Sequence, residues 1–306
     1  MENKQVFLFC FAIVAVLLSY LGGTNSRMNK IKGSWKSEDG SLYLTFSNKK
    51  VIWCKKGKLV VFNARYFNSA FKLKNWMVTY GREIKYKYRL ENSKLYLREG
   101  ASKEYILSRI ERPPRKCLII PLKLGKKVQL TQSQSDKIKL QLKKRGEADQ
   151  AVRTNLQKAV KSKEVDRSNS NWLIRLVRKI GWIDVKRFGE EASKNAFLIV
   201  QHSRNVRLML AVLPEIEKDV KAGLMDPQSF SLLYDRTKLY LAQKQRYGTQ
   251  IITTATGKRV IPAVESKDKI DDYRSAIGLF PLSLYLQILK RVTGMQESEE
   301  IEILEE

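Results

Sequence analysis

The sequence has little of what several common kinds of protein depend on. Among its 306 residues are only three cysteines and one histidine. Three cysteines exclude a small scaffold held by several disulfides and a zinc site with four cysteine ligands. A single histidine excludes any site that needs two, such as the HExxH zinc motif. With only 16 glycines and 7 prolines, the chain is neither collagen-like nor of low complexity.

Several enzyme signatures are also missing. The sequence contains no P-loop, no GxGxxG after a predicted strand, no GxSxG and no DxDxDG calcium loop. Those motifs supply a phosphate-binding backbone, a nucleophile or a metal site. A kinase, a Rossmann dehydrogenase and an α/β-hydrolase are therefore unsupported. We expect no metal and no other cofactor, because one histidine and scattered carboxylates lack a metal-ligand spacing.

What the chain does have is enough apolar sequence for real cores and a large positive charge. Hydrophobic residues make up 43% and the net charge is +27, so the length suits two ordinary domains. Residues 1–180 hold 40 Lys+Arg against 13 Asp+Glu, whereas residues 181–306 hold 18 of each. The electrostatic field of so many positive charges attracts polyanionic surfaces such as lipid head groups or cell-wall polymers. The alternative is that these lysines are simply solvated.

The N-terminus predicts export or anchoring. Residues 6–23 carry no charge, the length of a long signal-peptide core or a short membrane anchor, so residues 1–26 are interpreted as one or the other. We expect a bacterial envelope or periplasmic protein. A cytoplasm-facing anchor stays open, because Arg27, Lys30, Lys32 and Lys36 follow the segment and positive charges favour the cytoplasmic side.

Residues 31–125 predict a basic antiparallel β-domain. Apolar and cationic residues alternate over 84–90, and similar short runs recur every 8–12 residues, which predicts about eight strands in a closed barrel or sandwich. Expected strands include residues 76–80 and 117–124. Two cysteines lie in such runs, Cys54 and Cys117, and we expect buried free thiols, with a disulfide as the alternative.

The domain's start, Gly33-Ser34-Trp35, has the Gly-x-Trp spacing found where the first strand enters a lipocalin-type barrel. With the hairpins behind it, this part resembles small lipocalin-like domains. The resemblance implies an apolar ligand cavity; the alternative is a barrel filled by its own side chains. Because alternation puts Tyr86 and Tyr88 on the face opposite Lys85 and Lys87, nucleic acid is not an expected partner.

Beyond a polar linker at 126–139, the apolar period becomes helical. The expected fold is therefore α+β: the barrel, then a mostly α-helical domain at 140–293 and an acidic tail at 294–306, taken as a solvated helix end. Helices are expected over residues 140–160, 172–180, 190–203, 206–221, 227–241, 267–277 and 282–292, with a short hairpin near 251–258.

Six short motifs follow one another in the helical part: Asp149-Gln150-x-x-Arg153, Gly181-Trp182, Gly189-Glu190, Gln201-His202, Asp235-Arg236 and Tyr247-Gly248-Thr249-Gln250. In this order they resemble the bacterial domain of unknown function 6624, over about residues 140–290. Departures from the pattern are Ile183, Arg204, Ala242 and Lys244. The resemblance implies no activity, so the chemistry is argued from residue types.

The motif residues predict a polar pocket for an anionic small molecule or nucleotide. Histidine has an ordinary pKa near neutrality, so His202 is the candidate acid or base, oriented by Asp235 or Glu190. Tyr247 is the third catalytic candidate. Arginines bind phosphate or carboxylate bidentately. The substrate-binding candidates are Asp149, Gln150, Arg153, Gln201, Arg236, Gln245, Thr249 and Gln250.

Two functions compete. One is a hydrolase or transferase acting on the anionic molecule. The other is a non-catalytic envelope protein with a polyanion-binding barrel, in which the buried polar residues only tie helices together.

Overall fold

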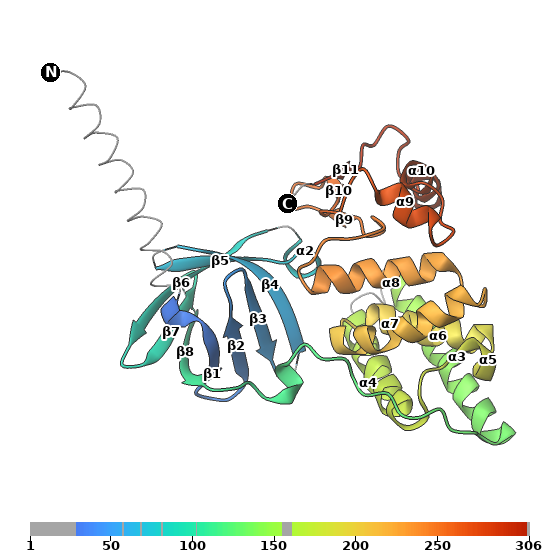
Figure 1. Cartoon of the computed structure of the whole chain (residues 1–306), viewed down its shortest axis with the longest axis horizontal. Coiled ribbons are helices and arrows are strands. Elements are labelled where there is room, and N and C mark those ends of the chain that lie inside the picture. The colour runs from blue at the N-terminus through green and yellow to red at the C-terminus, as the bar shows by residue number, and fades with distance from the viewer. Residues whose placement is uncertain are drawn as a thin grey trace. The chain divides into compact units, whose positions relative to one another are not determined.

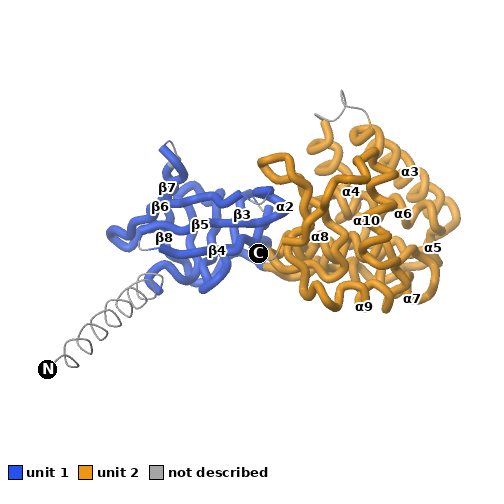
Figure 2. The backbone as a smooth tube through the Cα atoms, turned by 90° about the horizontal axis from the view of Figure 1, so that it is seen from above, with its two compact units in different colours: residues 1–118 blue, residues 119–306 orange. Residues whose placement is uncertain are grey.

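The computed structural model describes residues 29–56, 58–67, 69–80, 82–101, 103–154 and 161–304. The chain forms two compact units, residues 1–118 and 119–306 (Figures 1 and 2). The boundary between the two units thus falls several residues before residue 125, where the β-domain was expected to end. Residues 1–26, expected as a signal peptide or anchor, lie outside the described residues. Within those described ranges, no helix is long and apolar enough to cross a membrane.

Unit 1 is a closed antiparallel barrel of eight strands in chain order, which confirms the predicted β-barrel (Figure 1). Pairing of β1 with β8, with Ser34 opposite Ile110, closes it. The strands are β1 (Gly33–Ser37), β2 (Leu42–Phe46), β3 (Lys50–Lys55), β4 (Lys58–Tyr66), β5 (Ala70–Lys74), β6 (Ile84–Glu91), β7 (Lys94–Glu99) and β8 (Lys103–Ile110).

Alternation along these strands turns one set of side chains inward. Leu42, Leu44 and Phe46 of β2 are buried in one cluster with residues from the facing strands. Trp35 also belongs to this cluster, and its indole N–H donates to the carbonyl of Ile31 at 2.8 Å. The barrel interior is therefore a hydrophobic core of the barrel's own side chains. The lipocalin-like resemblance stays a prediction.

One apolar run expected as a strand is a helix instead. Residues Trp76–Thr79 form α2, between β5 and β6. Asn75 caps it: the side-chain oxygen accepts from the N–H groups of Met77 and Val78, and the amide donates to the carbonyl of Val61 at 2.6 Å. An N-cap asparagine satisfies the free amides of a first turn, which outweighs the β preference of the run.

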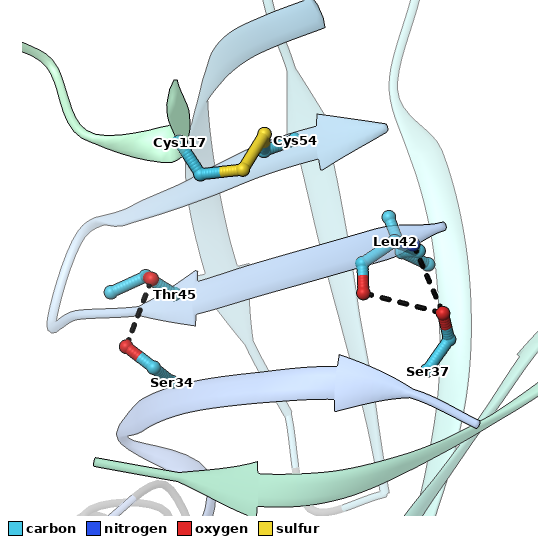
Figure 3. Close-up of a disulfide and its surroundings, with 6 residues drawn as sticks. All are labelled: Ser34, Ser37, Leu42, Thr45, Cys54 and Cys117. Atoms are coloured by element: carbon cyan, nitrogen blue, oxygen red, sulfur yellow. Dashed lines mark hydrogen bonds between the residues drawn. A yellow bond between two sulfur atoms is a disulfide. The ribbon is translucent and has the colours of Figure 1, made fainter. Parts of the chain in front are cut away.

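Cys54 and Cys117 form a disulfide, so the expectation of free thiols is wrong (Figure 3). Inward-facing Trp53 is opposite Leu44, so its neighbour Cys54 faces outward from β3. Cys117 ends a short 3-10 helix, Arg115–Cys117. Figure 3 also shows two links between β1 and β2, from Ser34 to Thr45 and from Ser37 to Leu42.

The expected strand at 117–124 is absent as well. After residue 118 the chain follows the helices of unit 2, where the N–H of Leu122 donates to Arg207 and that of Gly125 to Val177. These single backbone bonds to two helices do not make a strand ladder.

Unit 2 is mostly helical, as predicted. Its helices are α3 (Gln132–Thr154), α4 (Ser162–Ile180), α5 (Val185–Phe188), α6 (Glu190–His202), α7 (Val206–Lys221), α8 (Pro227–Tyr240), α9 (Ile270–Ser275) and α10 (Leu282–Thr293). Helix α3 begins inside the stretch expected as a linker. Thr131 and Gln134 explain this, because each side chain accepts from the other's backbone N–H in a capping box.

A small sheet completes unit 2, in the order β11-β10-β9. Strands β9 (Ile252–Thr253) and β10 (Arg259–Ile261) are the expected hairpin, and β11 (Glu302–Ile303) runs parallel to β10. The tail expected to be solvated therefore belongs to the fold. Its acidic residues pair with hairpin cations, Glu302 with Lys258 and Glu299 with Arg259.

Candidate functional site

A histidine–carboxylate pair lies where α3 packs against α6. Asp149 is 1% exposed, and its two oxygens lie 3.0 and 2.9 Å from Nδ1 of His202. The close approach of the helices depends on Gly146, because a Cβ there would overlap the side chain of Asn195. His202, at the last turn of α6, keeps 17% of its side chain exposed. Its Nε2 has no hydrogen-bond partner among the described residues.

Two further groups bind the same carboxylate. Gln150 donates its amide to Asp149 at 2.8 Å. The Arg153 guanidinium lies 3.0 Å from the Asp149 carboxylate and 2.6 Å from that of Asp166 on α4. Asp149 thus binds an imidazole, an amide and a guanidinium, while Arg153 keeps 26% of its side chain exposed.

Arg236 of α8 extends this cluster through neutral partners. Its Nε donates to Oε1 of Gln250 at 3.0 Å and its Nη1 to the backbone carbonyl of Gln201 at 3.1 Å. Gln201 precedes His202 in the chain. The side-chain oxygen of Gln201 is buried without a hydrogen-bond partner among the residues described.

Arg236 is a partly buried cation in a positive environment. Burial lowers the pKa of its guanidinium, and the nearby positive charges of Arg153 and Arg204 lower it further. Across the described residues it forms no ion pair with a carboxylate. A guanidinium that is partly removed from water without a carboxylate partner is costly, and an anionic ligand would supply the missing charge.

A second network surrounds Asp235 and is separate from the histidine. Asp235 is fully buried and accepts hydrogen bonds from the backbone N–H groups of Arg246, Tyr247 and Thr249 and from the Thr249 hydroxyl, all at 2.8–3.2 Å. Burial raises the pKa of Asp235, whereas these hydrogen bonds lower it. Asp235 therefore fixes the loop after α8 and does not orient His202.

Two other buried side chains hold the same loop. Gln245 accepts from the N–H of Gln250 at 2.8 Å and donates to its carbonyl at 3.2 Å. Arg274, 1% exposed, donates to the carbonyls of Tyr247 and Phe280. The loop in turn presents the side chain of Gln250 to Arg236. The two networks thus meet at this one amide.

Tyr247 lies in an aromatic cluster rather than beside His202. Its ring contacts Phe230 and Tyr234, with centroids 6.3 and 5.4 Å apart. Burial raises its pKa to about 12, so it does not exchange a proton readily near neutrality.

The predicted site residues therefore divide into two groups. The structure brings together Asp149, Gln150, Arg153, His202, Gln201, Arg236 and Gln250. It places Asp235, Gln245, Tyr247 and Thr249 in the second network, which holds the loop after α8. Glu190 begins the helix that His202 ends, about 18 Å away along its axis, and cannot orient it.

Sequence reasoning missed two participants, Asp166 and Arg274. Asp166 meets Arg153 from the following helix, a contact that no spacing rule reveals. Within the described part of the chain, no group of three or more His, Cys, Asp or Glu residues is arranged to hold a metal ion.

The comparisons with known proteins bear on this unit alone. A family model described as a family of unknown function (DUF6624) matches residues 134–297, which is more than half of the 306 residues. The match covers helices α3 to α10 and confirms the resemblance seen in the motifs. No curated protein and no solved structure matches the chain.

Proposed function

Because this chain belongs to the family of unknown function DUF6624, which brings no activity with it, we propose a function from the site itself. Unit 2 is an acid–base catalyst of the hydrolase or transferase type, and its substrate is an anionic small molecule. The observation that carries this proposal is the Asp149–His202 pair, with Nδ1 held at 2.9 Å and Nε2 without a partner among the described residues.

His202 is the general base in this proposal. A carboxylate on Nδ1 fixes the ring orientation and leaves the lone pair of the neutral imidazole on Nε2. Nε2 then takes a proton from water or a hydroxyl nucleophile as that oxygen attacks the substrate. Asp149 stabilises the imidazolium that forms, and the imidazolium returns the proton to the leaving group.

The two arginines bind the anion. Arg236 lacks a carboxylate partner among the described residues, and Arg153 is partly exposed beside the pair. Guanidinium groups bind phosphate and carboxylate oxygens in a planar fork. Burial is the main cause of the lowered pKa of Arg236, and the charge of Arg153 adds to it. A phosphate or carboxylate placed between the two arginines would offset their mutual repulsion.

We also propose that the protein is exported or held at the cell envelope. The disulfide supports this, because disulfides persist in oxidising compartments and are rare in the cytosol. The uncharged run at residues 6–23 is consistent with a targeting or anchoring role.

Thermal unfolding with defined anions tests the catalytic proposal. Inorganic phosphate, AMP and glucose 6-phosphate would be added to protein starting at Arg27, which keeps every described residue. We expect at least one anion to raise the Tm. Arg236→Gln should abolish that shift. His202→Gln should keep it while losing at least 100-fold in turnover of the responding anion's esters, the usual contribution of a general base.

The matched control is Arg204→Gln, which removes an exposed cation of the same region and should keep most of the turnover. If His202→Gln unfolds many degrees earlier and no anion shifts the wild type, the Asp149–His202 pair is structural. The non-catalytic envelope function then takes the place of the enzyme.

A further inference from the structure

The outer wall of the barrel around β5 and β6 is strongly cationic. Residues directly opposite across these strands carry the same charge: Arg65 faces Lys72, Lys72 faces Lys85, and Lys87 faces Arg98. Like charges directly opposite each other destabilise a sheet. Such a row therefore indicates a surface that meets an anionic partner.

Few acids offset this charge. Glu83 pairs with Lys72 at 2.7 Å and lies 3.9 Å from Arg65, and Glu104 of β8 is directly opposite Arg98. Lys85 and Lys87 form no ion pair among the described residues, and both are exposed. The wall keeps a net positive charge even with its ion pairs counted.

An apolar tip, residues 76–80, adjoins the same wall. Helix α2 and its flanks join the end of β5 to the start of β6, the two lysine-bearing strands (Figure 1). Val78 is 39% exposed and Tyr80 is 55% exposed. Trp76 is half-buried, with Nζ of Lys74 4.3 Å from its ring centre. Arg82 follows at the base of the tip and is exposed.

The tip is fixed rather than loose. Asn75 is 1% exposed; it caps the helix and binds the carbonyl of Val61 on β4. Thr79 donates its hydroxyl to the carbonyl of Asn75 at 2.8 Å. Because the polar residues of the turn face inward, Val78 and Tyr80 are held outward.

We propose that this surface, the α2 tip with Lys72, Lys85 and Lys87, docks onto an anionic lipid membrane. Lysine side chains near a membrane are attracted to anionic head groups, and tryptophan and tyrosine favour the membrane–water interface. A soluble polyanion such as nucleic acid or a cell-wall polymer would use the lysines but would have no need of exposed Val78. The inference is independent of the catalytic proposal.

The test is binding to vesicles by protein starting at Arg27, which removes the uncharged N-terminal run. Vesicles of phosphatidylcholine alone are compared with vesicles that also contain phosphatidylglycerol. We expect binding only to the anionic vesicles, weakened by salt. The double variant Lys85→Gln/Lys87→Gln should bind at least tenfold more weakly, since each cation near an anionic surface adds to the attraction.

Variants of the tip separate lipid docking from attraction to any polyanion. Val78→Ser and Tyr80→Ser should each weaken vesicle binding without weakening binding to heparin. Phe67→Ser removes an aromatic side chain that is also exposed, but in the turn between β4 and β5, and should change neither. Lys137→Gln/Lys144→Gln on α3 removes the same charge from unit 2 and should bind vesicles like the wild type.

Tryptophan fluorescence gives a second readout. Brominated lipids should quench the emission of bound wild-type protein, and Trp76→Phe should bind but lose most of that quenching. Equal binding of the tip variants and the wild type, with no quenching at Trp76, would overturn the proposal in favour of a soluble polyanion. Equal binding to both kinds of vesicle would overturn it as well.

Discussion

Two buried carboxylates of unit 2 differ in the donors they meet. Asp149 faces side chains, an imidazole and a guanidinium, that can change charge partners when a ligand arrives. Asp235 faces backbone N–H groups that cannot move without unfolding the loop. The first arrangement suits chemistry and the second suits stability.

Asp235→Asn should therefore destabilise unit 2 by about 3 kcal/mol. One amide oxygen can serve a single pair of donors, while the new NH₂ group faces the other pair and leaves buried groups unsatisfied. Urea unfolding measures the loss. Asp226→Asn on the same helix is the control: Asp226 caps α8 by accepting from Gln228, and asparagine caps about equally well. A loss below 1 kcal/mol at Asp235 would contradict this account.

Gly248→Ala should cost about 2–4 kcal/mol. Its φ is +67° and a Cβ would lie 2.9 Å from Cδ1 of Ile270, so both backbone strain and overlap oppose a side chain. Gly257 has φ +84° with nothing near its missing Cβ. Gly257→Ala should thus show the strain alone, about 1 kcal/mol. Equal losses at the two glycines would exclude the packing explanation.

Some of the residues that gather around His202 could be predicted from the sequence, but not how they pair. His202 was found because it is the only histidine, and Asp149 because it belongs to a motif. The carboxylate expected beside His202 was Asp235 or Glu190, and the structure places Asp149 there. The pairing depends on how α3 packs against α6, across 53 residues of sequence, and neither periodicity nor spacing encodes that contact.

At the scale of elements, the sequence predicted types better than boundaries. Alternation located most barrel strands and the 3.6-residue period located α6, α7 and α8 closely. Both wrong strands, residues 76–80 and 117–124, are short apolar runs, for which periodicity cannot separate helix, strand and extended segment. The N-cap at Asn75 favours a helix in the first run. In the second run, hydrogen bonds to the helices of unit 2 hold the chain as an extended segment.

The junction of α5 and α7 should give a pH-dependent stability. Burial raises the pKa of Asp219, and the charges of Asp184 and Glu215 raise it further, against Lys127 and a backbone hydrogen bond. A raised folded-state pKa means that protonated Asp219 favours the fold at low pH, and that this contribution is lost as pH rises through that pKa. At neutral pH the ionised carboxylate is therefore unfavourable.

Asp219→Asn should raise the unfolding free energy of unit 2 at pH 7 by roughly 0.5–1 kcal/mol, the size of a single charge interaction. The gain should vanish in acid. Urea unfolding at pH 4 and pH 7 measures it. Glu217→Gln is the control, because Glu217 pairs with Lys221 on the exposed side of α7. If Asp219→Asn changes the unfolding free energy equally at both pH values, this explanation is wrong.

At the scale of the whole molecule, each unit is stabilised by different interactions. Unit 1 has a disulfide that closes 63 residues of chain, whereas unit 2 relies on helix packing and buried polar networks. We expect two calorimetric transitions, since compact units with their own cores unfold as cooperative bodies.

A reductant should lower only the Tm of unit 1, because losing the cross-link of a loop of this length removes about 4 kcal/mol of stability. Gly248→Ala should lower only the Tm of unit 2. Cys10→Ser should change neither, because Cys54 and Cys117 already pair. A single transition that both treatments shift equally would show that the units unfold as one body.

The disulfide also determines how the chain would carry mechanical load. The barrel lies in the sequence between the N-terminal segment and unit 2, so tension between them enters before β1 and leaves after residue 118. The Cys54–Cys117 bond lets that tension bypass β4 to β8. About 220 Å of chain, from 63 residue steps of about 3.5 Å each, stays slack until the bond is reduced. Only β1 to β3 would bear the pull, so the oxidised barrel acts as a short tether and the reduced barrel as a long one.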